Sequence, residues 1–200
     1  FSEKCRDSGL AFGVGLSPLA LHRSWNGGGR KDLDYKVDHL RTLGIDILAV
    51  LFDDMRGNFG GLAQLQADIV HFAADLADVE HIWMCPTYYS HSSILDVLFG
   101  DRPSEYLSTL GELLDPSIGV FWTGPQIVSK DSPDDHLELI AEQLQRPPIL
   151  WDNYPVNDGP LMSPHLHLRA PNRPPRLLEQ AGHVAINPMN QAWLSRIPIR

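Results

Sequence analysis

Residues 45–54 read IDILAVLFDD, an almost uninterrupted apolar run that ends in two adjacent carboxylates. A continuous apolar run, unlike an alternating one, is typical of a parallel strand that is buried on both faces. Two carboxylates are costly inside a core, so the run must end where they begin. The stretch therefore predicts a buried parallel strand with Asp53 and Asp54 at its carboxyl end.

Five further apolar runs follow the same pattern, and each ends in polar or turn residues. They read GLAFGVGL, HIWMC, IGVFW, PILW and HVAI, at residues 9–16, 81–85, 118–122, 148–151 and 183–186. The six runs begin about 30–37 residues apart, which is close to one unit of a (β/α)8 barrel, where roughly 250 residues form eight units.

Helix signals separate the runs. Asp32 and Gly44 enclose the first amphipathic stripe as its cap and its stop, and Ser132 with Pro133 opens the fourth. The five predicted helical stretches lie around residues 32–43, 62–76, 106–114, 132–144 and 176–180.

Alternating strands and helices predict an α/β fold of the (β/α)8 TIM-barrel type, with about six β/α units in residues 1–200 as a single domain. A doubly wound sheet is the alternative, but residues 13–15 and 27–29 lack the GxGxxG context and read as turns. Six strands would leave two long edges open, so we expect other sequence to complete the barrel at both ends.

Composition excludes several classes of function. The formal net charge of −9 disfavours nucleic acid, which needs a basic surface. No run of apolar residues is long enough to span a membrane, and FSEKCRDSG is not a signal peptide. Two cysteines make no disulfide framework, which favours a cytoplasmic location.

The predicted strand ends collect carboxylates, amides and aromatic rings. Carboxylates and amides bind hydroxyl groups, and aromatic rings cover the apolar face of a sugar, whereas phosphate substrates would call for lysine and arginine clamps. The ends read SP at 17–18, DD at 53–54, PTYY at 86–89, TGP at 123–125, DNYPVND at 152–158 and NPMN at 187–190. The pattern predicts a sugar site.

Asp53 and Asp54 admit two interpretations. They are a solvated loop start or helix cap, or a catalytic pair in which proximity lets one acid keep its proton while the other stays ionised. Because neighbouring side chains on a strand point to opposite faces, both reach one pocket only if the strand ends or bends there.

Other candidates are weaker. Cys85 reads as a buried core thiol, and Trp151 as either a core residue or a sugar platform. His165 and His167 form an HxH that lacks a third metal ligand at suitable spacing. Three more histidines read as surface or boundary residues: His71, His91 and His136.

Five strings at the strand ends resemble glycoside hydrolase family 84, the protein O-GlcNAcases and related bacterial β-N-acetylglucosaminidases. They are LAVLFDD, MCPTYY, FWTGPQIVSK, ILWDNYPVND and INPMN, in family order on five successive strands. The similarity covers roughly residues 9–195 and implies a catalytic barrel. The family's two earlier strands, which carry GFYG and KDD segments, have no counterpart here, and the last helix stops early near residue 200.

The resemblance implies a role for each matching residue. Asp53 matches the carboxylate that orients the substrate's 2-acetamido group, and Asp54 matches the general acid/base. The implied binding residues are Tyr89, Cys85 and Trp151 around the acetyl group, Asn153 at the acetamido region, Asp158 at the O4/O6 edge, Asn187 at a sugar hydroxyl and Thr123 in the pocket wall.

The implied activity is retaining hydrolysis of terminal β-linked N-acetylglucosamine through an oxazoline intermediate, with no metal or organic cofactor. The leaving group would be the Ser or Thr of a glycoprotein, or another sugar. Two alternatives stay open: a non-catalytic protein that binds N-acetylglucosamine or a glycopeptide on an incomplete barrel, and a barrel enzyme with a metal on His165 and His167.

Overall fold

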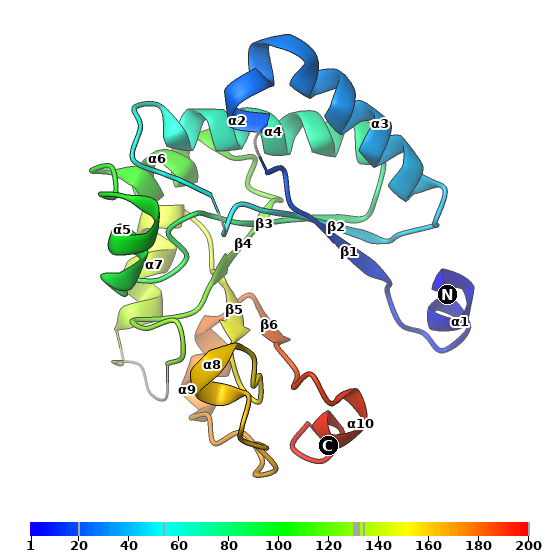
Figure 1. Ribbon diagram of the computed structural model, residues 1–200, viewed down its shortest axis with the longest axis vertical. Helices are drawn as coiled ribbons and strands as arrows, with labels where there is room; N and C mark the ends of the chain where they lie inside the picture. The colour runs from blue at the N-terminus through cyan, green and yellow to red at the C-terminus, as the bar shows by residue number, and fades with distance from the viewer. Residues whose placement is uncertain (20, 54, 130–132, 134, 200) are drawn as a thin grey trace.

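A single curled sheet of six parallel strands forms the centre of the protein, and strand order follows chain order (Figure 1). The computed structural model describes residues 1–19, 21–53, 55–129, 133 and 135–199. Pairing is parallel throughout, from Gly13 opposite Ile47 to Ile149 opposite His183. The strands are β1 (Gly13–Leu16), β2 (Ile47–Leu51), β3 (His81–Cys85), β4 (Gly119–Trp122), β5 (Ile149–Asp152) and β6 (His183–Ile186).

The longer helices lie along the outer side of the sheet, and successive ones contact each other (Figure 1). They are α3 (Arg30–Arg41), α4 (Leu62–Ala77), α6 (Tyr106–Leu113), α7 (His136–Leu144) and α9 (Pro175–Gln180). Shorter elements are α1 (Ser2–Asp7), α2 (Leu21–Ser24), the π-helix η1 (Trp25–Gly29), α5 (Ile94–Phe99), α8 (Gly159–Met162) and α10 (Ala192–Ser195). In the described part of the chain, no helix has the length and apolar character needed to span a bilayer.

The sheet carries apolar side chains on both faces, as the continuous runs predict. On β2, Leu48 and Val50 are fully buried in the core shared with the helices. Ala49 and Leu51 belong to a second cluster on the inner, concave side, which also holds Trp83, Phe121 and Trp151. The predicted parallel α/β barrel architecture is therefore confirmed, with its strands curled as part of a (β/α) barrel.

Several predicted helix boundaries are wrong. The first helix begins at Arg30, two residues before the predicted cap Asp32, and the segment Trp25–Gly29 that leads into it kinks at Gly27, whose backbone angles are not helical. The fourth begins at His136 with Asp135 as its N-cap, so Pro133 precedes it, while Ser132 lies outside the described residues. The short helices α1, α2, α5, α8 and α10 offer too few turns for a periodic signal.

His136 is buried, so the surface or boundary position predicted for it is wrong. Its Nε2 accepts a hydrogen bond of 3.0 Å from Nε1 of Trp122, a fully buried residue of β4. The His91 ring lies at 5.2 Å from the His136 ring. Burial, and then the charge of nearby His91, lower the pKa of His136 to about 4.

This pKa predicts a pH-dependent stability. The unfolded state binds more protons than the folded state between the usual pKa of 6.5 and about 4, so the stabilisation is complete above pH 6.5 and is lost as pH falls toward 4. His136→Gln keeps an acceptor for Trp122 but does not titrate, so its unfolding midpoint should fall less over this range. Urea unfolding at several pH values measures this. His39→Gln, at an exposed site on α3, should show the same pH dependence of the unfolding midpoint as the parent protein. If the midpoint changes equally with pH in all three proteins, His136 is not the group responsible.

Candidate active site

The carboxyl ends of β2, β3, β4, β5 and β6 meet at one pocket of about 280 Å³. Every described residue that the sequence predicted for the site lines it: Asp53, Cys85, Tyr89, Thr123, Trp151, Asn153, Asp158 and Asn187. Asp54, the predicted acid/base, lies outside the described residues. Three apolar residues were not predicted as lining residues: Ile127, Val128 and Val156. Two of them belong to the FWTGPQIVSK string, whose turn after Gly124 was the available signal.

Asp53 reaches the pocket because it continues the inward-facing series of β2. Ala49 and Leu51 face the concave cluster, and a residue two positions further points to the same side. The strand ends at Leu51, and Asp53 lies in the turn that follows, partly exposed to the pocket. The geometric condition for an inward carboxylate is therefore met at Asp53.

A hydrogen-bonded group of amides forms one wall. Asn153 Oδ1 accepts bonds from Trp151 Nε1 at 3.0 Å and from Asn187 Nδ2 at 2.9 Å. Its Nδ2 donates to the Ile127 carbonyl at 2.8 Å. These three bonds fix the orientation of the Asn153 amide, and within the described chain its second N–H has no partner. The wall thus offers a fixed donor to a bound acceptor.

Thr123 and Cys85 form the buried floor. The Thr123 hydroxyl lies 3.3 Å from the Tyr89 carbonyl and 3.1 Å from the Gln126 carbonyl, and the Thr123 N–H donates to the same Tyr89 carbonyl. Thr123 therefore holds the backbone of Tyr89 in place. The Cys85 thiol is 4% exposed and donates weakly to the Pro86 carbonyl, consistent with the buried thiol expected from the sequence.

Asp158 is carried into the pocket by a loop that Asn157 anchors. Asn157 is fully buried, and its Nδ2 donates to the His165 carbonyl and to Gln191 Oε1 at 2.9 and 2.8 Å. Its Oδ1 accepts from the Asn190 N–H at 2.9 Å. Asn157 thereby joins the loops after β5 and β6.

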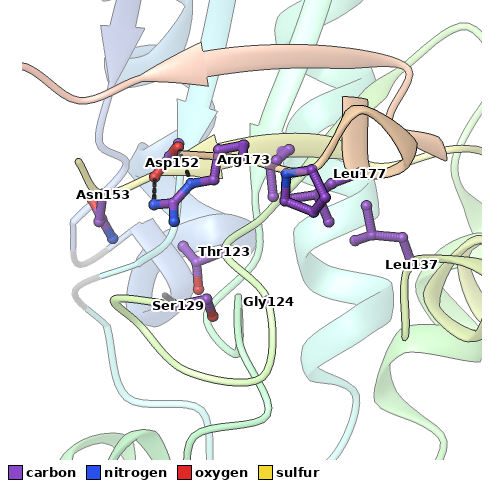
Figure 2. Close-up of a pocket in the computed structure, with 10 residues that line it drawn as sticks. Thr123, Gly124, Ser129, Leu137, Asp152, Asn153, Arg173 and Leu177 are labelled. Carbon is purple, nitrogen blue, oxygen red and sulfur yellow. Dashed lines mark hydrogen bonds and ion pairs between the residues drawn. The ribbon is translucent and has the colours of Figure 1, made fainter. Parts of the chain in front are cut away.

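Asp152 lies between two pocket residues but faces away from them. It is buried and forms a two-pronged ion pair with Arg173, with Arg173 Nε at 2.7 Å from Oδ2 and Nη2 at 2.5 Å from Oδ1 (Figure 2). A small cavity of about 20 Å³ adjoins the pair, bordered by Thr123 and Leu177. The pair ties the proline-rich loop 171–175 to the end of β5, a function that sequence reasoning missed.

The histidines of the HxH do not form a metal site with other described residues. No group of three or more His, Cys, Asp or Glu side chains in that part of the chain is placed to hold a metal ion. The His165 carbonyl binds Asn157, and the His167 N–H donates to the Met189 sulfur at 3.3 Å.

The chain is similar to a known family and to several of its members. Residues 2–200 match the family model described as beta-N-acetylglucosaminidase. The chain is 34% identical over 135 residues to the Protein O-GlcNAcase of Rattus norvegicus and of Mus musculus, which covers 63% of this chain and 14% of each relative. It therefore spans a small part of those proteins.

Two solved structures share the fold. A variant of the Thermobaculum terrenum O-GlcNAc hydrolase is 30% identical with a TM-score of 0.81, over 98% of this chain and 44% of that one. CpGH84B is 23% identical with a TM-score of 0.80, over 96% of this chain and 34% of that one, and shows the fold alone. By its family match and its relatives, the chain belongs to the β-N-acetylglucosaminidases of glycoside hydrolase family 84.

Proposed function

We propose that this chain supplies the catalytic carboxylates and most of the sugar-binding residues of a retaining β-N-acetylglucosaminidase of the O-GlcNAcase type. One observation carries the proposal: an inward carboxylate, Asp53, shares a pocket of about 280 Å³ with Tyr89, Trp151, Asn153, Asp158 and Asn187. Such a set of acids, amides and aromatic rings suits a neutral sugar that has an acetamido group.

The reaction begins with the acetamide oxygen of the substrate, which attacks the anomeric carbon as the bond to the leaving oxygen breaks. Asp53 accepts a hydrogen bond from the acetamide N–H and stabilises the positive charge that develops on the forming oxazoline ring. Asp54 protonates the leaving oxygen. No protein nucleophile is needed, because the substrate delivers its own in the correct geometry.

Water completes the reaction. Asp54, now a carboxylate, takes a proton from the attacking water. The water oxygen bonds to the anomeric carbon as the bond from that carbon to the acetamide oxygen breaks. Two displacements at one carbon give retention of configuration. The natural substrate we propose is β-linked N-acetylglucosamine on Ser or Thr of a glycoprotein, and the mammalian relatives bear the name Protein O-GlcNAcase.

Asp158 provides a test of the sugar orientation. It lines the pocket from the loop after β5, where a charged acceptor can hold the sugar's O4/O6 edge. In the full-length protein, Asp158→Ala should weaken an N-acetylglucosamine-derived inhibitor by roughly 10- to 100-fold, since hydrogen bonds to charged groups contribute about 1.5–3 kcal/mol.

Isothermal titration calorimetry measures the affinity for the inhibitor. In parallel, hydrolysis of an aryl β-N-acetylglucosaminide measures turnover by the parent protein. Asp75→Ala, an exposed acid on α4, is the matched control and should bind normally. Unchanged affinity in Asp158→Ala would refute the assigned contact. Binding without turnover by the parent protein would instead favour a non-catalytic sugar-binding protein.

A further inference from the structure

A group of buried polar side chains that hydrogen-bond to one another packs against the turn that follows β2 and contains Asp53. Its members are Gln66 of α4, Thr87 just after β3, and Tyr106 at the start of α6, and each is at most 3% exposed. Gln66 Nε2 donates to Thr87 Oγ1 at 2.8 Å, the Thr87 hydroxyl donates to the Phe52 carbonyl at 2.8 Å, and the Thr87 N–H donates to the Tyr106 oxygen at 3.1 Å. The Tyr106 hydroxyl completes the group by donating to Gln66 Oε1.

Chemistry fixes the direction of every bond in this group. Burial raises the pKa of Tyr106, so the phenol keeps its proton and donates it. Because the Tyr106 oxygen accepts from a backbone N–H, its own proton goes to Gln66 Oε1, and the Gln66 amino group must face Thr87. The Thr87 oxygen accepts there, so its single proton is left for the Phe52 carbonyl.

The group forms hydrogen bonds to Phe52 and Met55, the residues that flank the acid pair in sequence. Phe52 directly precedes Asp53, and its carbonyl is held by Thr87. Met55 follows the acid pair, and its sulfur accepts a hydrogen bond of 3.8 Å from Gln66 Nε2. Thr87 also lies two residues before Tyr89 in the same strand end. One set of buried bonds therefore holds the backbone carbonyl that precedes Asp53, the Met55 side chain, and the backbone N–H of Thr87 two residues before Tyr89.

We propose that Gln66, Thr87 and Tyr106 are positioning residues, which set where Asp53 and Tyr89 lie against the substrate's acetamido group. The inference rests on the proposed function. Buried polar groups are costly unless each is satisfied, and a fully satisfied group holds one geometry. A displacement of about 1 Å at a reacting group lowers a rate by roughly 100-fold, so rigid support of this turn matters for catalysis.

The hydroxyl of Thr87 gives the sharpest test. In the full-length protein, Thr87→Val keeps the shape of the side chain but releases the Phe52 carbonyl, so kcat should fall by roughly 10- to 100-fold while KM changes little. Affinity for a thiazoline analogue of the oxazoline should fall in parallel, while affinity for free N-acetylglucosamine stays the same. Thr87→Ser restores the hydroxyl and should restore kcat.

Tyr106→Phe is a second route to the same result, since it leaves Gln66 Oε1 and the Thr87 N–H without their partner. Tyr88→Phe is the matched control: it removes the phenol of another buried tyrosine, next to Thr87 in sequence, whose hydroxyl donates to the Gly100 carbonyl and not to this group. Its kcat should stay near that of the parent.

The outcomes separate the two levels of the proposal. If the parent protein neither hydrolyses an activated aryl β-N-acetylglucosaminide nor binds the thiazoline, the proposed function fails. If the parent protein is active but Thr87→Val and Tyr106→Phe match Tyr88→Phe in kcat and thiazoline affinity, the positioning role is overturned. Loss of melting temperature in the two variants with unchanged kcat would overturn it equally, because the group would then be purely structural.

Discussion

Asp54→Asn in the full-length protein is expected to lower kcat/KM by about 10²–10⁴-fold toward substrates with a poor leaving group, which is the range of general-acid contributions. An alkyl or seryl oxygen must receive a proton as its bond to the sugar breaks. An activated aryl oxygen leaves as a stable anion, so the same variant should keep much more of its activity on an aryl glycoside. Steady-state rates on both substrate types measure the difference.

Asp53→Asn should be measured beside Asp54→Asn, because the two variants are expected to differ in how their rates depend on the leaving group. Asp53 faces the pocket and, as proposed, orients and stabilises the acetamide, which is needed whatever group departs. Its replacement should therefore slow both substrate types similarly. If the two variants respond in the same way to leaving-group quality, the division of labour between the two acids is wrong.

Arg146→Met is expected to cost about 3 to 5 kcal/mol of unfolding free energy, because each buried acceptor left unsatisfied costs about 1–3 kcal/mol and the variant removes the donor from several of them. Arg146 is 9% exposed and donates to five backbone carbonyls. They belong to Gly111, Leu114, Asp115, Ile118 and Leu144. The first two lie at the carboxyl end of α6, where a cation is also favoured by the helix dipole. Methionine would fill much of the space but remove the guanidinium donor from all five carbonyls, although the Asp115 carbonyl would keep a backbone partner, the Ile118 N–H at 3.0 Å.

Urea unfolding followed by tryptophan fluorescence measures this loss. Arg146→Lys keeps the charge but has fewer donors in a less suitable geometry, so it should fall between the parent and Arg146→Met. Arg41→Met, at an exposed site at the end of α3, should change stability little. A loss for Arg146→Met no larger than that for Arg41→Met would contradict the bracing role.

The sequence predicts the barrel strands well because their signal is local. In LAVLFDD, burial on both faces and the end of the strand are both encoded within seven letters, while the structure adds that Ala49, Leu51 and Asp53 face the concave side. The predicted site residues that the structure describes meet because parallel strands bring their carboxyl ends to one edge. Their catalytic and binding roles stay predictions.

Other features escaped prediction because they depend on distant partners. Asp152 lies at the same predicted strand end as the pocket residues Trp151 and Asn153, so the sequence does not distinguish its role from theirs. Nothing near it in sequence indicates that Arg173 is its partner. Gln66 reads as one polar residue in an amphipathic helix, although its position four residues after Leu62 places it on the buried face. His136 is buried with its Nε2 hydrogen-bonded to Trp122, a partner on another element that lies 14 residues away in sequence.

The strand order has a consequence for biosynthesis. Because every strand pairs with the one translated just before it, each β/α unit can dock as it leaves the ribosome, in the N-terminal-first manner of domain folding during synthesis. The pocket, however, draws its residues from Asp53 through Asn187. A nascent chain can thus pair its early strands while it still lacks part of the pocket, so a product that ends before residue 187 would retain Asp53 but lack the Asn187 side of the site.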